Sequence, residues 1–276
     1  MDDKTIAFAD GTRVCRLGQG TWAMGKSPGR RDEEIRALRR GIELGMNIID
    51  TAEMYGNERL VGEAIRGLRD RTFVVSKCLP SNADRRGTKR ACERSLARLG
   101  IDRIDLYLLH WKGHYPLSET VQALQELQHE GKIARWGVSN IDLPDMQLIA
   151  SMPGGDSCAT DQVLYNMCER GVEYDLLGWC RDRGMPVMAY SPIAEGRLLA
   201  HPTLQTIAAR HDATPARIAL AWVLRQPGVI AIPKAGNPAH TDDDYLSLDI
   251  RLTDGDLRDI DAAFPPPAHR IPLAGW

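Results

Sequence analysis

The chain has 276 residues, of which 43% are hydrophobic and 26% charged, and its formal net charge is −2. This length suffices for one large barrel or two small domains, and the composition is that of an ordinary globular protein. The near balance of 35 basic and 37 acidic side chains argues against a nucleic-acid partner or an anionic membrane surface. No apolar run reaches the roughly 18–20 residues that a membrane-spanning helix needs.

The six cysteines show no metal-binding or disulfide pattern. No two are spaced as C-x-x-C, and no histidine cluster lies beside them, so we expect neither a zinc site nor a disulfide framework. Residues 1–4, Met-Asp-Asp-Lys, carry no apolar core of signal-peptide length. Together with reduced thiols, this start predicts a cytoplasmic protein. Because no apolar surface stripe stands out, we expect a monomer.

The first predicted element along the chain is a small hairpin, made of residues 5–8, a turn at Asp10-Gly11, and residues 13–15. Short apolar strands and amphipathic helices then alternate. The predicted strands end near Thr21, Asp50, Lys77, His110, Asn140, Gln162, Tyr190 and Pro233. The predicted helices cover residues 32–45, 57–69, 86–99, 118–130, 142–151, 173–183 and 203–225, followed by a weaker one near 238–246.

Eight strand–helix units without a linker predict a (β/α)8 TIM barrel, with residues 1–276 in a single domain. The strands are continuous apolar runs, which suits parallel strands buried on both faces. We expect a C-terminal helix after the barrel and then an irregular, proline-rich tail from residue 264. The tail either folds over the barrel mouth, with Arg270 or Trp276 at the substrate, or is a disordered end.

One stretch favours a competing fold. Residues 18–23, Gly-Gln-Gly-Thr-Trp-Ala, match the G-x-G-x-x-A pattern of a dinucleotide-binding loop. Such a loop must open a helix directly, whereas Gly25, Pro28 and Gly29 follow within a few residues and would break one. We therefore favour the barrel over a doubly wound open sheet.

Ionisable residues stand at the ends of three consecutive predicted strands. Asp50 ends the second strand, with Tyr55 five residues on, and Lys77 and His110 end the third and fourth. Because the carboxyl ends of barrel strands surround one pocket, we expect these four side chains to converge there. Simpler interpretations remain: a capping Asp50, a packing Tyr55, a surface Lys77 and a His110 bonded to nearby backbone. Lys77 could also be the Schiff-base nucleophile of a barrel aldolase.

These four residues resemble the catalytic tetrad of the aldo-keto reductases. The resemblance covers residues 4–263, and residues 18–25, 52–55 and 187–192 are most similar to bacterial members that reduce methylglyoxal. The motifs that resemble the family in order and spacing are Asp50-Thr51-Ala52 with Tyr55-Gly56, Leu109-His110-Trp111, Gly137-Val138-Ser139-Asn140 and Ile232-Pro233-Lys234.

The resemblance implies reduction of small aldehydes or ketones, such as methylglyoxal, by hydride from NADPH, with NADH as the other candidate. Tyr55 would be the general acid, and cationic Lys77 would lower the pKa of its phenol from about 10. Asp50 would hold Lys77, and His110 would donate a hydrogen bond to the carbonyl oxygen. The alternative is a nicotinamide-binding redox sensor or regulatory subunit without turnover, against which the intact tetrad argues.

The resemblance also implies the remaining contacts. Ser139, Asn140 and Gln162 would hold the nicotinamide carboxamide, and Tyr190 would stack on its ring. The other implied cofactor contacts are Gly20, Thr21, Trp22, Asp50, Ser191, Ile193, Gly196, Leu198, Lys234, His240 and Asp244. The substrate would touch Trp22, Tyr55, His110 and Trp111, although core packing is an alternative role for the two tryptophans.

The expected site for the 2′-phosphate of NADPH departs from the family pattern. The family has a lysine and, six residues on, an arginine, but this chain has Lys234 and then His240. A neutral histidine lacks the bidentate grip of arginine on phosphate. The three carboxylates of residues 242–244 would also oppose a dianion. We therefore expect NADPH, with a weaker preference over NADH than is usual, and a preference that falls further at high salt.

Overall fold

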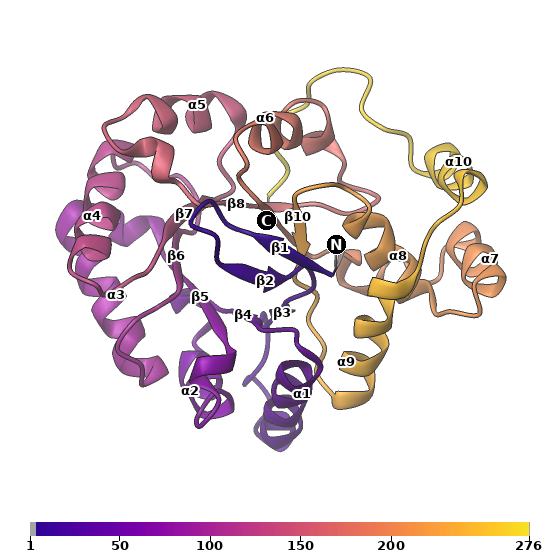
Figure 1. Cartoon of the computed structure of the whole chain (residues 1–276), viewed down its shortest axis with the longest axis horizontal. Helices are drawn as coiled ribbons and strands as arrows, with labels where there is room; N and C mark the ends of the chain where they lie inside the picture. Colours follow the sequence, from indigo (N-terminus) through magenta and orange to yellow (C-terminus); the bar gives the residue numbers. More distant parts are fainter. Residues whose placement is uncertain (1–3, 276) are drawn as a thin grey trace.

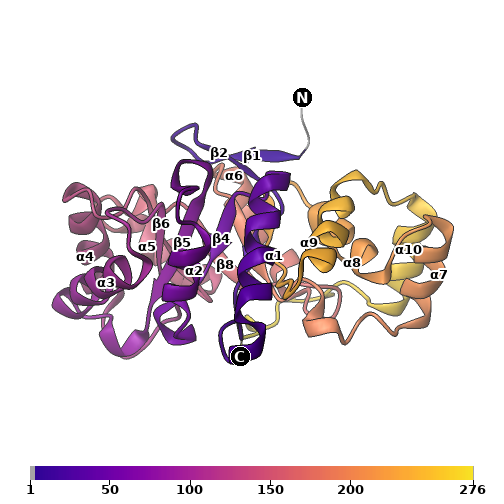
Figure 2. The ribbon, with the colours of Figure 1, turned by 90° about the horizontal axis from the view of Figure 1, so that it is seen from below.

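The computed structural model describes residues 4–275. They begin with the predicted antiparallel hairpin, formed by β1 (Thr5–Ala7) and β2 (Arg13–Cys15). Phe8, which follows β1, stacks on Phe73 at the first residue of β5 with ring centroids 5.3 Å apart. The hairpin therefore closes the amino-terminal end of the sheet, and Figure 2 shows it on the opposite side of the molecule from the C-terminal tail.

Parallel strands follow, and within residues 4–275 they form one eight-stranded sheet in chain order. They are β3 (Gln19–Gly20), β4 (Ile48–Asp50), β5 (Phe73–Cys78), β6 (Leu106–Leu109), β7 (Trp136–Ser139), β8 (Asp161–Leu164), β9 (Val187–Tyr190) and β10 (Val229–Ala231). A parallel bridge between Leu17 and Ala231 joins the two edges, so the sheet curls into the predicted barrel (Figure 1).

The seam between β3 and β10 depends on a close backbone approach. Gly18 N donates to Ala231 O, and Gly20 N donates to Pro233 O, each at 2.8 Å. A Cβ on Gly20 would stand only 2.7 Å from Ile232 O. Residues 18–20 therefore serve strand closure, and the glycine pattern that resembled a dinucleotide-binding loop opens no helix.

Helices surround the barrel (Figure 1). They are α1 (Arg31–Leu44), α2 (Glu58–Ala64), α3 (Arg85–Leu99), α4 (Leu117–His129), α5 (Leu143–Ser151), α6 (Leu176–Asp182), α7 (Pro202–Arg210), α8 (Pro215–Leu224), α9 (Pro238–Tyr245) and α10 (Asp254–Ala263). The main hydrophobic core lies between sheet and helices, with Trp136 and Trp222 fully buried. No helix in the described part of the chain is long and apolar enough to cross a membrane.

Two predicted helices were wrong in extent. The single helix expected over residues 203–225 is two helices, because Thr214 Oγ1 accepts from Arg217 N at 3.2 Å and Pro215 begins α8. A threonine cap followed by proline starts a new helix and cannot continue an old one. The helix expected over residues 57–69 already ends at Ala64, and a 3-10 turn, Arg69–Arg71, follows.

The tail folds over the carboxyl-terminal mouth of the barrel, which is one of its two expected outcomes. Residues 264–275 hold neither helix nor strand. Arg270 forms ion pairs with Asp142 and Asp175, each at 3.0 Å, so its guanidinium is held by acids and not by an open substrate pocket. A Cβ on Gly275 would lie 3.8 Å from Asn140 Oδ1. Trp276, the other expected substrate contact, lies outside the described residues.

Candidate active site

Lys77 and Asp50 form a buried ion pair at the ends of neighbouring strands. Lys77 Nζ donates to Asp50 Oδ1 at 2.7 Å and to Thr51 O at 2.8 Å. Burial opposes the charged amine, but Asp50 and Tyr55 together outweigh it, so the pKa of Lys77 is raised and the side chain is cationic. Its side chain is 0% exposed. A buried cation is a poor Schiff-base nucleophile, which argues against the aldolase interpretation.

Tyr55 joins this pair through its hydroxyl, which lies 3.4 Å from Lys77 Nζ. Tyr55 ends a 3-10 turn, Glu53–Tyr55, after which Gly56 takes a left-handed φ of 72°. The pKa of Tyr55 is raised, because burial disfavours the phenolate more than the charge of Lys77 favours it. Lys77 does act to lower this pKa, as expected, but burial reverses the net shift, so the phenol keeps its proton at neutral pH.

His110 lies next to Tyr55 on the other side, with ring centroids 5.7 Å apart. Burial and the nearby charge of Lys77 lower the pKa of His110 to about 3, so its imidazole is neutral. Its Nδ1 is buried and has no hydrogen-bond partner among residues 4–275. The simple interpretation of a backbone-bonded histidine therefore fails for this atom. A neutral imidazole keeps one N–H, which can be given to a carbonyl oxygen.

Two tryptophans pack against the rings of Tyr55 and His110. Trp22 is 45% exposed and Trp111 is 38% exposed, so neither is a core residue. Trp22 meets the Tyr55 ring edge-on at 5.0 Å, and Trp111 lies 4.8 Å from the His110 ring. The four residues implied for substrate contact therefore lie in one cluster of ring contacts.

The residues implied for the nicotinamide carboxamide are linked to one another and to the tetrad. Asn140 Nδ2 donates to Ser139 Oγ at 3.0 Å, and Tyr190 OH donates to Asn140 Oδ1 at 2.8 Å. Gln162 Nε2 donates to Asp50 Oδ2 at 2.7 Å. Asn140 has a left-handed φ of 56°, which costs energy for a residue with a Cβ. Strands β4, β7, β8 and β9 thereby hold a preformed polar cluster.

The other implied cofactor residues divide into two groups. Thr21 is fully buried and donates to Asp50 O at 2.8 Å, beside Gly20 at the seam. Ser191, Ile193 and Gly196 surround the 3-10 turn Ala194–Gly196 after β9, where a ligand could follow the backbone. The side chain of Leu198 is 3% exposed and packs into the core, so the structure does not support a side-chain contact there.

The acids near the expected phosphate site are largely neutralised, contrary to the sequence-based expectation. Asp242 pairs with Arg40 and Asp243 pairs with Arg217, each at 2.7 Å. Burial and the charge of Asp243 raise the pKa of Asp244 to about 7. These side chains therefore present less negative charge to a ligand than the sequence indicates.

Glu53 is a site residue that the sequence reasoning missed. Its Oε1 accepts from Leu79 N at 2.6 Å and from Asn82 Nδ2 at 2.9 Å. These bonds fasten the turn that carries Tyr55 to the loop that follows Lys77. Its position two residues before Tyr55 could have indicated a role at the site. Its hydrogen-bond partners could not be identified from the sequence, because they lie 26 and 29 residues away.

Asn57 precedes helix α2, but its side chain joins two loops and does not cap the helix. Helix α2 begins at Glu58 after Asn57, but the Asn57 side chain makes no capping bond. Its Oδ1 accepts from Thr51 Oγ1 and its Nδ2 donates to Thr21 O, both at 2.7 Å. Asn57 therefore ties together the loops after β3 and β4, which carry Trp22 and Tyr55.

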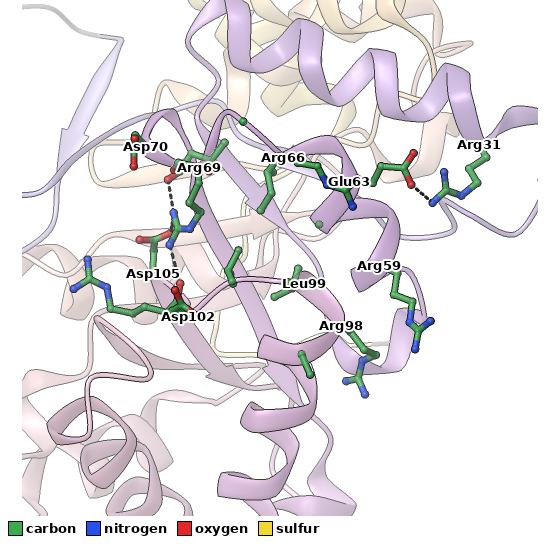
Figure 3. A pocket seen from close by; sticks show the side chains of 18 residues that line it. Arg31, Arg59, Glu63, Arg66, Arg69, Asp70, Arg98, Leu99, Asp102 and Asp105 are labelled. Carbon is green, nitrogen blue, oxygen red and sulfur yellow. Dashed lines mark hydrogen bonds and ion pairs between the residues drawn. The ribbon is translucent and has the colours of Figure 1, made fainter.

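A separate hollow of about 1040 Å³ lies outside the barrel, beside the ends of α2 and α3, and none of the tetrad lines it. Figure 3 shows Arg31 pointing toward Glu63, at 2.6 Å, and Arg69 close to Asp105, at 2.8 Å. These contacts form a surface network of ion pairs. No group of three His, Cys, Asp or Glu side chains within residues 4–275 is placed to hold a metal ion.

A parallel barrel whose mouth holds a protonated phenol, a buried lysine and a neutral imidazole has the groups that carbonyl oxidoreduction requires. The chain belongs to the aldo/keto reductase family, whose model matches residues 16–264. It is therefore an oxidoreductase, as the tetrad resemblance implied.

Three relatives illustrate the similarity. Methylglyoxal reductase YeaE of Escherichia coli K12 is 48% identical over 281 residues, which cover 99% of each chain. A crystal structure of an aldo-keto reductase from Klebsiella pneumoniae in complex with NADPH has a TM-score of 0.97 and 48% identity, covering 100% of both chains. An NADH-specific methylglyoxal reductase of Escherichia coli is 31% identical over 88% of this chain and 92% of that relative. Relatives thus differ in cofactor.

Proposed function

We propose that this enzyme reduces small aldehydes and ketones, methylglyoxal among them, to alcohols with hydride from NADPH. The observation that carries the proposal is the Tyr55 hydroxyl, 3.4 Å from a cationic Lys77 and next to a neutral His110. The relative named methylglyoxal reductase supports the substrate, and the NADPH-bound neighbour supports the cofactor.

The polar cluster at the strand ends fits a nicotinamide cofactor. Asn140 and Gln162 present amide groups that can exchange hydrogen bonds with a carboxamide. Tyr190, at the end of the adjacent strand, offers an aromatic face. When bound, the cofactor supplies the hydride that goes to the carbonyl carbon.

The chain's own residues then handle the proton and the charge on the carbonyl oxygen. Tyr55 holds a proton at neutral pH, because its pKa is raised, and delivers it to that oxygen. His110 donates a hydrogen bond to the same oxygen and stabilises negative charge as it develops. Lys77 stabilises the phenolate that remains, and Asp50 keeps Lys77 charged and in position.

The test is the loss of NADPH absorbance with methylglyoxal, measured for wild type, Tyr55→Phe and Tyr174→Phe. Because the phenylalanine has no proton to give, we expect Tyr55→Phe to lower kcat by about 100-fold or more. Tyr174 is an exposed tyrosine, and its variant should match the wild type. Full activity in Tyr55→Phe would exclude Tyr55 as the acid. Tight NADPH binding without turnover of any aldehyde would favour the redox sensor.

A further inference from the structure

Two cations from distant parts of the sequence converge on Gly236. Arg30 ends the 3-10 turn Pro28–Arg30, directly before α1, and Lys234 follows β10. Arg30 Nη2 would lie 2.8 Å, and Lys234 Nζ 3.3 Å, from a Cβ built on Gly236. Arg30 Nη2 also donates to Gly236 O at 3.5 Å. The absence of a side chain at residue 236 leaves room for both cations.

Packing between α1 and α9 brings these cations together. The two helices lie side by side in Figures 1 and 2. Thr241 Oγ1 donates to Ala37 O at 3.4 Å, and Arg40 pairs with Asp242 at 2.7 Å. Arg30, at the start of α1, is therefore held next to the segment that leads into α9.

The two cations have little counter-charge. No carboxylate of residues 4–275 forms an ion pair with Lys234, and the one acid paired with Arg30 is Glu33, at a loose 3.7 Å and 42% exposed. The first two acids of α9 are engaged by Arg40 and Arg217 instead. Arg30 and Lys234 carry like charges and lie close to the same residue, Gly236, so they repel each other. An anion between them would remove that repulsion.

The geometry suits a phosphate monoester. A guanidinium can give two parallel hydrogen bonds to phosphate oxygens, and an ammonium adds a third. The positive end of α9 lies next to the same point, with His240 in its first turn. Gly20 N bonds to Pro233 O, directly before Lys234, at the barrel end that carries Tyr55. A cofactor with one end at Tyr55 can therefore place a phosphate here.

We propose that Arg30 binds the 2′-phosphate of NADPH together with Lys234 and sets the preference for NADPH over NADH. The inference rests on the proposed use of NADPH. Arg30 comes from the segment before α1 and supplies the guanidinium that the sequence lacks at His240. Its consequence is a strong NADPH preference, in place of the weakened one that the sequence indicates.

The test measures the Kd of each cofactor directly. Quenching of protein fluorescence reports binding as NADPH or NADH is titrated in. Arg30→Gln removes the charge at an exposed position. We expect it to raise the Kd for NADPH about 10- to 100-fold, as for loss of a charge-assisted bond, and to change the Kd for NADH less than about twofold. Arg31→Gln is the matched control, because this neighbouring arginine pairs with Glu63 at 2.6 Å, and it should change neither value.

A rescue variant separates phosphate binding from a structural effect. In the Arg30→Gln background, His240→Arg should restore most of the lost NADPH affinity, because it returns a guanidinium to the same site. The Kd of the wild type for NADPH should also rise more steeply with salt than that of Arg30→Gln.

Equal changes in the Kd values of both cofactors would overturn the inference, because Arg30 would then serve a part common to NADPH and NADH. An unchanged Kd for NADPH in Arg30→Gln, or a wild type that binds both cofactors equally, would also overturn it. Binding is measured without turnover. An enzyme that binds NADPH through Arg30 but reduces no carbonyl would refute the proposed function alone.

Discussion

At the residue scale, burial decides the protonation states at the barrel mouth. Tyr55 and His110 are both shifted toward their neutral forms by loss of water, whereas Lys77 stays charged because it is paired with the Asp50 carboxylate. A neutral phenol and a neutral imidazole are both hydrogen-bond donors toward a carbonyl oxygen. The site thus presents two neutral hydrogen-bond donors, Tyr55 and His110, next to the buried cation of Lys77.

The buried neutral His110 predicts a loss of stability in acid. Its folded pKa of about 3 lies below the unfolded value of about 6.5, so between these values the unfolded state binds the extra proton. Above about pH 6.5 this proton uptake costs the folded protein nothing. Below that pH the free energy of unfolding falls by about 1.4 kcal/mol per pH unit toward pH 3. In urea unfolding at pH 7 and pH 5, the wild type should lose about 2 kcal/mol more than His110→Gln does.

The control for this pH dependence is His129→Gln, which replaces an exposed histidine in α4. This variant should keep the pH dependence of the wild type. An identical loss of stability in His110→Gln and the wild type would mean that His110 is not buried as a neutral group.

At the element scale, the seam between β3 and β10 closes the barrel with few residues. The strand β3 has two residues, and its neighbour across the seam approaches so closely that only glycine fits at residue 20. The segment that begins at Thr21, which we propose contacts the cofactor, continues directly from this seam. The geometry of the mouth therefore depends on how tightly the seam is closed.

Gly20→Ala should destabilise the protein, because the new Cβ would stand 2.7 Å from the backbone oxygen of Ile232. We expect a loss of about 2–4 kcal/mol in the free energy of unfolding in urea. Gly29→Ala is the matched control, since a Cβ there meets nothing within 4 Å, and it should change stability by less than about 0.5 kcal/mol. Equal stabilities of the two variants would contradict the close approach at the seam.

At the scale of the whole molecule, the tail returns from α10 to the mouth and is fastened to it. Arg270 binds acids in two loops, Asp142 before α5 and Asp175 before α6. Leu273 adds an apolar contact with the main core. Partly exposed ion pairs contribute little to global stability, so their role is to position the tail next to Asn140.

Arg270→Gln should release the tail and leave the barrel intact. We expect subtilisin, which unlike trypsin does not need the arginine that this change removes, to cut within residues 264–275 several times faster in this variant. The reason is that a released segment without helix or strand is accessible to the protease. Global stability in urea should change by less than about 1 kcal/mol. The measurement is the rate of tail loss followed by mass spectrometry. An unchanged cutting rate would show that the two ion pairs do not hold the tail.

Much of the fold could be predicted because it depends on local patterns. Apolar strands at regular spacing with amphipathic helices between them predict a parallel barrel, and the hairpin follows from its turn. The helix split at residues 211–214 was also local, since Thr214-Pro215 is a helix-start signal that the apolar pattern obscured. The tail was less predictable, because its position depends on Asp142 and Asp175, more than 90 residues earlier.

The sequence by itself determined the class of this protein. It predicts a barrel with Asp50, Lys77 and His110 at strand ends and Tyr55 in the loop after Asp50, and strand order alone brings those ends to one mouth. Tertiary structure decided the rest. The raised pKa of Tyr55 follows from loss of water, which no residue type or spacing specifies. The neutralised acids of α9 and the meeting of Arg30 with Lys234 follow from helices that pack side by side. The charge state of each site residue depends on its neighbours in three dimensions, whereas the position of each strand end depends on the order of the strands along the chain.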